Sequence, residues 1–283
     1  MDEAEAAEVG MNFIQHAEMH GLVIDHLISD GRWHRVATGD KPKKRNGAYL
    51  YDGRRGVVKN WATMELFAPY PERGSYQPVD RKDLNERRKK ADNEEALKHA
   101  KAAQEALRII SLSTVSKHPY LARKGFPDAT GLVREGLLII PVRDFKTNAV
   151  ISLQTVGDEK KFLYGGRTKG GVLVLGQKWG GGAKYLCEGY ATGLSIKVAL
   201  ASMYKEAQVY VCFSASNLVH VAERVGGDRI VVADNDQAGM DAAKATGLPY
   251  VHSPVEGEDM NDLHQRAGIW ELLRVFKSIN QGA

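Results

Sequence analysis

Three acidic residues follow short apolar segments in the second half of the 283-residue chain. Glu188 comes directly after residues 184–187, and Asp234 and Asp236 come just after residues 229–233. Carboxylates that lie close together repel one another unless a proton or a cation relieves the repulsion. Because oxygen ligands suit Mg²⁺ or Mn²⁺ rather than zinc, these residue types predict a site for a hard divalent cation.

The elements that must position these acids follow an alternating pattern. Each acidic segment comes after an apolar run typical of a buried parallel strand and precedes a helical pattern, and one more strand and helix, at 208–213 and 217–225, lie between them. Because sites in open α/β sheets form at the carboxyl ends of the strands, we expect the three acids to meet there. The alternatives are a solvated loop with an Asp helix cap, and for Glu188 a charge at a helix N-terminus.

The acids at 188 and 234–236, together with the segment 258–262, resemble the Toprim domain, which is shared by bacterial-type primases, topoisomerases and some nucleases. Three further segments are similar to the primases of phages and conjugative plasmids: residues 118–125, 140–144 and 188–192. The resemblance is strong over 116–264 and weak before residue 90.

This resemblance implies a DNA primase of phage or plasmid type, a nucleotidyltransferase that makes short RNA primers from ribonucleoside triphosphates on single-stranded DNA. It implies Mg²⁺ or Mn²⁺ held by Asp234, Asp236 and Asp259, with Glu188 as a further ligand or as the base. Glu188, Asp234 and Asp236 are thus the expected catalytic residues. Asn261 stands where many relatives have a second Asp, and we expect it to bind metal more weakly.

Basic residues before Glu188 are expected to hold nucleotide or template. By the same resemblance, Arg143 and Lys161 line a basic groove beside the metal site. Arg167 and Lys169 lie in the glycine-rich segment 165–171, whose backbone is able to approach a phosphate. The alternative for Arg143 is an ion pair with Asp144, which follows it, or with another acid.

The net charge of +4 is distributed unevenly along the chain. Residues 32–90 contain 16 Lys and Arg against seven acids, whereas residues 188–283 contain eight against twelve. A basic front half joined to an acidic, metal-competent back half is typical of a protein that binds a polyanion and processes phosphates. The alternative is that the basic stretch is a solvated surface.

Aromatic residues and glycines alternate over residues 32–61, which predicts a small antiparallel β-module. Its interleaved cations and rings predict template binding by stacking and charge. The expected template-binding residues are Arg32, Trp33, Arg35, Lys59 and Trp61. Related primases often carry a zinc ribbon here, but this chain has no cysteine before Cys187, so no zinc is expected.

The patterns predict an α/β chain of four parts. These are a β-rich template-binding module (1–68), a basic linker (69–91), a small mixed α/β lobe that is helical and basic (92–182), and a Toprim catalytic domain with a parallel sheet, flanking helices and a C-terminal helix (183–283). In the lobe, Asp92 and Glu95 form a capping pattern, which predicts a helix over 92–110.

Only two cysteines occur, Cys187 and Cys212, which favours a reduced, cytoplasmic protein of a bacterial host cell. No stretch approaches 18 apolar residues, so no membrane association is expected. The resemblance implies a separately encoded replicative helicase or single-strand-binding protein as a further partner. Two other classes stay open: a Toprim-type metal-dependent nuclease, and a non-catalytic single-stranded DNA-binding accessory protein of replication.

Overall fold

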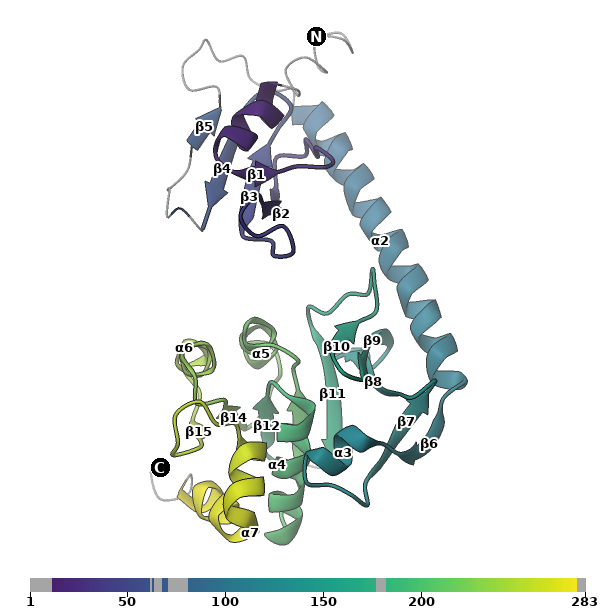
Figure 1. Ribbon diagram of the computed structural model, residues 1–283, viewed down its shortest axis with the longest axis vertical. Coiled ribbons are helices and arrows are strands. Elements are labelled where there is room, and N and C mark those ends of the chain that lie inside the picture. Colours follow the sequence, from purple (N-terminus) through teal and green to yellow (C-terminus); the bar gives the residue numbers. More distant parts are fainter. Residues whose placement is uncertain (1–11, 62, 64–67, 71–80, 177–181, 279–283) are drawn as a thin grey trace. The chain divides into compact units, whose positions relative to one another are not determined.

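The computed structural model describes residues 12–61, 63, 68–70, 81–176 and 182–278 (Figure 1). The chain divides into two compact units, residues 1–97 and 98–283, and each is described by itself. Within the described ranges, none of the helices combines the length and the apolar composition that a bilayer crossing requires.

The first unit contains a five-stranded antiparallel sheet in the order β1-β2-β3-β4-β5. Its strands are β1 (Leu22–Val23), β2 (Trp33–Thr38), β3 (Gly47–Tyr51), β4 (Gly56–Asn60) and β5 (Ala68–Tyr70). One face packs on a helical segment at 12–19, where the ring of Phe13 stacks on Tyr51 with 4.3 Å between centroids. The predicted β-rich N-terminal module is confirmed.

The long helix α2 (Arg81–Ser111) differs from expectation in where it begins. Residues 81–91 were expected to belong to a linker, and the remaining linker residues 71–80 lie outside the described part of the chain. Arg88 Nε donates to the Asp30 carbonyl oxygen at 2.8 Å, so this basic part of the helix is anchored to the sheet of the first unit. Asp92 does not cap a helix, because it lies inside α2 and pairs with Arg32 (Arg32 Nη2 to Asp92 Oδ2, 3.0 Å).

The second unit is built on a mixed sheet of ten strands. Its strands are β6 (Thr114–Lys117), β7 (Thr130–Arg134), β8 (Leu137–Asp144), β9 (Val150–Val156), β10 (Lys160–Phe162), β11 (Gly171–Gly176), β12 (Lys184–Cys187), β13 (Gln208–Val211), β14 (Arg229–Ala233) and β15 (Tyr250–His252). Its helices are the C-terminal part of α2, with α3 (Pro119–Arg123), α4 (Tyr190–Ser202), α5 (Ala215–Ala222), α6 (Gln237–Thr246) and α7 (Met260–Ser278).

The strand order is β10-β9-β8-β11-β13-β12-β14-β15, with β7 on β8 and β6 on β7. β12 runs parallel to β13 and β14, and β14 runs parallel to β15, whereas the pairs from β6 to β11 are antiparallel. The parallel part therefore carries the alternating strands and helices that the sequence predicted, and the antiparallel part forms the expected lobe before it.

Helices cover both faces of the parallel strands. Because side chains alternate along a strand, Tyr185 and Cys187 of β12 pack against α4 and α7, whereas Leu186 packs on the side of α5 and α6. Gly268, with φ of 76°, interrupts the helical geometry of α7, so the helix expected from residue 269 forms only its second half. The predicted α/β fold class is confirmed.

Candidate active site

The strand register brings the predicted acids together. Leu186 of β12 lies beside Val231 of the parallel strand β14, so Glu188 and Asp234 leave the same edge of the sheet on neighbouring strands. Gly239 lies so close to Asp234 in space that a Cβ atom at position 239 would overlap the Asp234 backbone. This close approach lets α6 begin directly after the acidic turn.

The loop that carries Asp259 is tied to this edge by backbone hydrogen bonds. The N–H of Asn235 donates to the Glu258 carbonyl oxygen at 3.0 Å, and the N–H of Gly257 donates to the Asn235 carbonyl oxygen at 2.6 Å. The acidic segment before α7 therefore lies against the turn that carries Asp234 and Asp236.

Asp234 occupies the centre of this acidic set. Burial, followed by the charges of Glu188, Asp259, Asp236 and Asp262, raises the pKa of Asp234 to about 7. Its Oδ1 atom is buried and has no hydrogen-bond partner among the described residues. A buried carboxylate oxygen without a donor and ringed by other acids is the arrangement that a hard cation relieves, so these residues fit a divalent metal ion.

Glu188 has a raised pKa for the same two reasons, since burial acts first and the charge of Asp236 adds to it. The N–H of Ala215 opposes this rise by donating to the Glu188 carboxylate. The residue is therefore a partly buried carboxylate, which is a stronger base than an exposed one.

Two of the acids also bind backbone groups. Asp236 caps α6 by accepting from the Gly239 N–H at 2.7 Å, as the alternative interpretation expected. Asp259 accepts from the N–H groups of Asn261 (2.6 Å) and Asp262 (2.9 Å) at the start of α7. Among the described residues, no three acidic, histidine or cysteine side chains already have metal-coordinating geometry. The acids thus lie within electrostatic reach of one another, with their orientations set partly by these caps.

Asn261 does not have the predicted role. Its side chain is fully buried, and its Nδ2 donates to the Lys124 carbonyl oxygen (2.9 Å) and to Ser195 Oγ (3.1 Å). Its Oδ1 accepts from Gln265 Nε2 at 3.0 Å. Both ends of the amide are therefore occupied, and Asn261 joins α7 to α4 and to the end of α3 rather than facing a metal.

The four predicted basic residues already have protein partners or lie in the solvent. Arg167 pairs with Asp144 at 2.7 Å; burial alone would raise the pKa of Asp144, but Arg167 and the backbone of the following turn lower it to about 2. Arg143 donates to the Asn148 carbonyl oxygen at 3.0 Å. It does not pair with Asp144, its alternative partner, which binds Arg167. Lys161 pairs with Glu159 at 2.9 Å on an exposed surface, and Lys169 is exposed.

A basic cleft beside the acids was not predicted. It is lined by Tyr120, Arg123, Lys124, Val156, Gly157, Asp158 and Lys160. Lys124 Nζ lies 3.7 Å from Asp262 Oδ1, and the charge of Asp259 contributes to the raised pKa of the buried Tyr120 hydroxyl, so the cleft adjoins the acidic set. Lys160 Nζ lies 5.6 Å from the centre of the Tyr120 ring.

The resemblance to related primases selected Lys161, but the alternation of side chains along β10 favours its neighbour Lys160. Lys160 and Phe162 project to one side of the strand, where Lys160 meets Tyr120 of the cleft and Phe162 meets Phe213, whereas Lys161 projects to the other side. The period of two, applied outward from Phe162, is the sequence signal that identifies Lys160.

The expected template-binding residues of the first unit lie in two places. The Arg35 guanidinium lies 4.1 Å and the Lys59 ammonium 4.8 Å from the Trp61 ring centre, so β2 and β4 bring these three together. Trp33 and Trp61 are 47% and 42% exposed, respectively. Arg32 is instead paired with Asp92 of α2.

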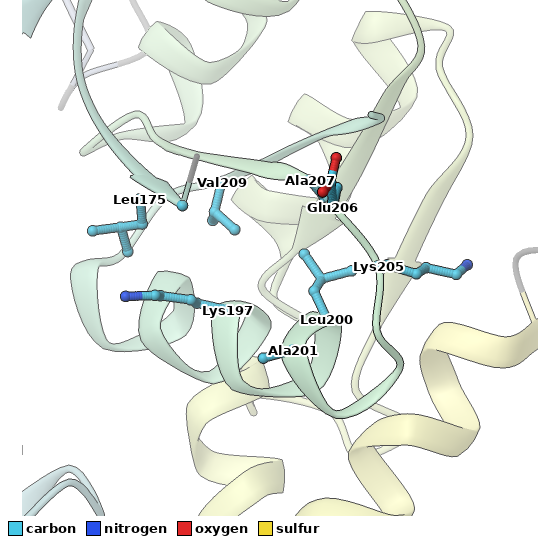
Figure 2. A pocket seen from close by; sticks show the side chains of 9 residues that line it. Leu175, Lys197, Leu200, Ala201, Lys205, Glu206, Ala207 and Val209 are labelled. Atoms are coloured by element: carbon cyan, nitrogen blue, oxygen red, sulfur yellow. The ribbon is translucent and has the colours of Figure 1, made fainter. Parts of the chain in front are cut away.

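The pocket in Figure 2 lies away from the acids. Its walls come from Leu175 at the end of β11, Leu200 and Ala201 on α4, and Val209 at the start of β13. Since Val209 lies at the amino end of a parallel strand, this pocket opens at the edge opposite Glu188 and Asp234. It has no part in the candidate site.

Comparisons with known proteins bear on the part of the chain that contains the acids. Residues 183–269 match the family model of the Toprim domain. No curated protein matches. One similar solved structure contains the bacteriophage T7 lagging-strand DNA polymerase with the primase domains of two gp4 subunits, which are bound to an RNA/DNA hybrid and dTTP. Its matched chain is 16% identical over 60% of this chain and 93% of that chain, with a TM-score of 0.42.

Two more solved structures are similar at the same low level. The primase fragment of the bacteriophage T7 primase-helicase is 18% identical over 54% of this chain and 67% of that chain (TM-score 0.37). The DnaG catalytic core is 16% identical over 72% and 74% (TM-score 0.37). The assignment therefore rests on the family match, which includes Glu188, Asp234, Asp236 and Asp259: residues 183–269 of this chain form a Toprim domain.

Proposed function

We propose that this chain is a DNA primase, a nucleotidyltransferase that joins ribonucleotides into short primers on single-stranded DNA. The observation that carries the proposal is the buried Asp234 Oδ1, which has no donor among the described residues and lies among the acids of a Toprim domain. The basic cleft adjoining these acids supports a substrate with several phosphates, and the segments similar to phage and plasmid primases favour primer synthesis over cleavage.

Asp234, Asp236 and Asp259 are the proposed ligands of Mg²⁺ or Mn²⁺. Such an ion, when bound, polarises the α-phosphate and neutralises the leaving pyrophosphate. Glu188 is the proposed base for the attacking 3′-hydroxyl, because its burial and the neighbouring Asp236 raise its pKa toward the range in which a carboxylate accepts a proton efficiently.

Two cations of the cleft are the proposed contacts for the triphosphate: Lys124, which lies 3.7 Å from Asp262, and Lys160, which lies over the Tyr120 ring. Arg143, Arg167, Lys161 and Lys169 belong to the same lobe and are proposed to contact the template from its outer surface. In the first unit, Arg35, Lys59 and Trp61 form the proposed template contact, supported by their cation–π cluster. A separately encoded helicase or single-strand-binding protein is the proposed further partner.

The test is incorporation of labelled ribonucleotides on a mixed single-stranded template with Mg²⁺ or Mn²⁺. Wild type is run beside Asp234→Ala and Asp236→Ala, with Asp241→Ala on the exposed side of α6 as the matched control. Short labelled products from wild type and the control alone are expected. Cutting of the template by the same two proteins would replace the proposal with a nuclease. Tight DNA binding without any reaction would indicate an accessory protein.

A further inference from the structure

An unusual backbone conformation occurs next to Glu188. Phe213, directly after β13 and Cys212, has φ of 68°, a left-handed conformation that costs a bulky residue free energy. It allows the Phe213 N–H to donate to the Glu188 carbonyl oxygen at 2.9 Å, and the Ala215 N–H to reach the Glu188 carboxylate. The side chain of Phe213 is thereby placed beside the acidic edge.

A second phenylalanine contacts this ring from the antiparallel lobe. Phe162 of β10 meets Phe213 edge to face, with 5.8 Å between centroids and 80° between ring planes. Phe162 is nevertheless 39% exposed, so the contact leaves part of its surface to solvent. Its strand neighbour on the same side is Lys160, whose ammonium group lies over Tyr120 in the basic cleft.

This side of β10 thus presents an aromatic ring and a cation two residues apart, which is about 6.6 Å along a strand. That separation is similar to the one between the base and the 5′-phosphate of a nucleotide. An aromatic ring is a platform for any base, because every base has a π face, whereas a lysine binds phosphate by charge.

We infer that Phe162, supported edge-on by Phe213, is the surface on which the base of the bound nucleoside triphosphate stacks. The inference rests on the proposed function only in that the acids and the cleft bind such a nucleotide. It adds a base-binding wall to the site, and the wall lacks polar groups that would distinguish one base from another. Selection among the four bases is then left to pairing with a template.

The test compares binding of ATP with binding of ribose 5-triphosphate, which has no base, to the full chain in Mg²⁺ by titration calorimetry. We expect wild type to prefer ATP by about tenfold, within the range measured for base stacking on one aromatic side chain. Phe162→Ala should abolish this preference and leave the affinity for ribose 5-triphosphate unchanged. Phe162→Trp should keep it. Tyr250→Ala, which removes an equally exposed ring (39%) on β15, is the matched control and should keep it too.

Two outcomes would overturn the inference: an ATP preference that survives in Phe162→Ala, or an equal loss of affinity for both ligands, which would show a structural role. Primer synthesis by the same preparations separates the two proposals. If wild type makes no primer but shows the Phe162-dependent preference, the proposed function is wrong and the base wall stands. If wild type makes primers and Phe162→Ala keeps the ATP preference, only the base wall is wrong.

Discussion

The backbone N–H of Phe213 donates to the carbonyl oxygen of Glu188 across 2.9 Å, and it does so from a left-handed conformation. The turn that follows places Ser214 as the cap of α5, with its hydroxyl accepting from the Asn217 N–H at 3.3 Å. The turn between β13 and α5 is therefore hydrogen-bonded to Glu188. The conformational cost of Phe213 is offset by this hydrogen bond and by the cap of α5.

The left-handed conformation at Phe213 predicts an inverted order of stability for two substitutions. Because glycine adopts positive φ freely, Phe213→Gly should be more stable than Phe213→Ala by about 1 kcal/mol, although both lose the ring. Urea unfolding of the two variants measures the difference. At Phe162, which lies in a regular strand, the glycine variant should be the less stable one. The same order at both positions would contradict the prediction.

The raised pKa of Asp234 predicts a stability that depends on pH. An unfolded aspartate titrates near pH 4 and Asp234 at about 7, so the folded state binds the proton more tightly. Its stabilising contribution is complete below about pH 4 and is lost as the pH rises through about 7. In EDTA, the free energy of unfolding of Asp234→Asn should therefore be higher than that of wild type by about 1–3 kcal/mol at pH 8. Near pH 4 the two free energies should be equal.

Denaturant unfolding at both pH values measures this effect, with Asp241→Asn as the control for loss of a surface charge. Adding Mg²⁺ at pH 8 should stabilise the wild-type protein, because the ion replaces the proton in relieving the repulsion among the acids. The same addition should stabilise Asp234→Asn less. An equal stability difference at pH 4 and pH 8 would show that the neighbouring acids do not act on Asp234.

The opposite orientations of two adjacent lysines predict different kinetics. Lys160→Ala removes a cation of the cleft beside the acids and should raise the KM for ribonucleotides on the order of five- to thirtyfold. Lys161→Ala removes an exposed cation paired with Glu159 and should change that KM less than about twofold. Steady-state primer synthesis measures both. A larger effect at Lys161 would return the phosphate contact to the residue that the sequence favoured.

The buried amide of Asn261 predicts that restoring an aspartate there is harmful. A carboxylate cannot donate to the Lys124 carbonyl oxygen or to Ser195 Oγ, and it would bury a charge. Asn261→Asp should therefore lower the free energy of unfolding by about 2–4 kcal/mol. Thermal unfolding tests this, with Asn85→Asp on the exposed surface of α2 as the control. A stable Asn261→Asp variant with tighter Mg²⁺ binding would instead support the ligand role expected from the sequence.

The order of elements in the Toprim domain, and the strands from which its acids come, can be predicted from the sequence alone. Apolar runs of four or five residues followed by Glu188 or Asp234 predict parallel strands, because such runs are stable only when both faces are buried. The family match confirms the Toprim prediction, and the strand register places Glu188 and Asp234 at the same edge. These features depend on the pattern of apolar and acidic residues within short segments, and this pattern can be recognised in the sequence.

The partner of each polar group, by contrast, depends on contacts between segments that only the folded chain brings together. Asn261 turned inward because Lys124 and Ser195 approach it from α3 and α4, at separations of 137 and 66 residues. Asp92 lies inside α2 rather than at its start, and it pairs with Arg32, which is 60 residues away in the chain. Lys160 rather than Lys161 lines the cleft because β10 pairs with β9 in one register, and a shift of one residue would exchange them. Partner choice depends on distances between segments far apart in the chain, which no local pattern contains.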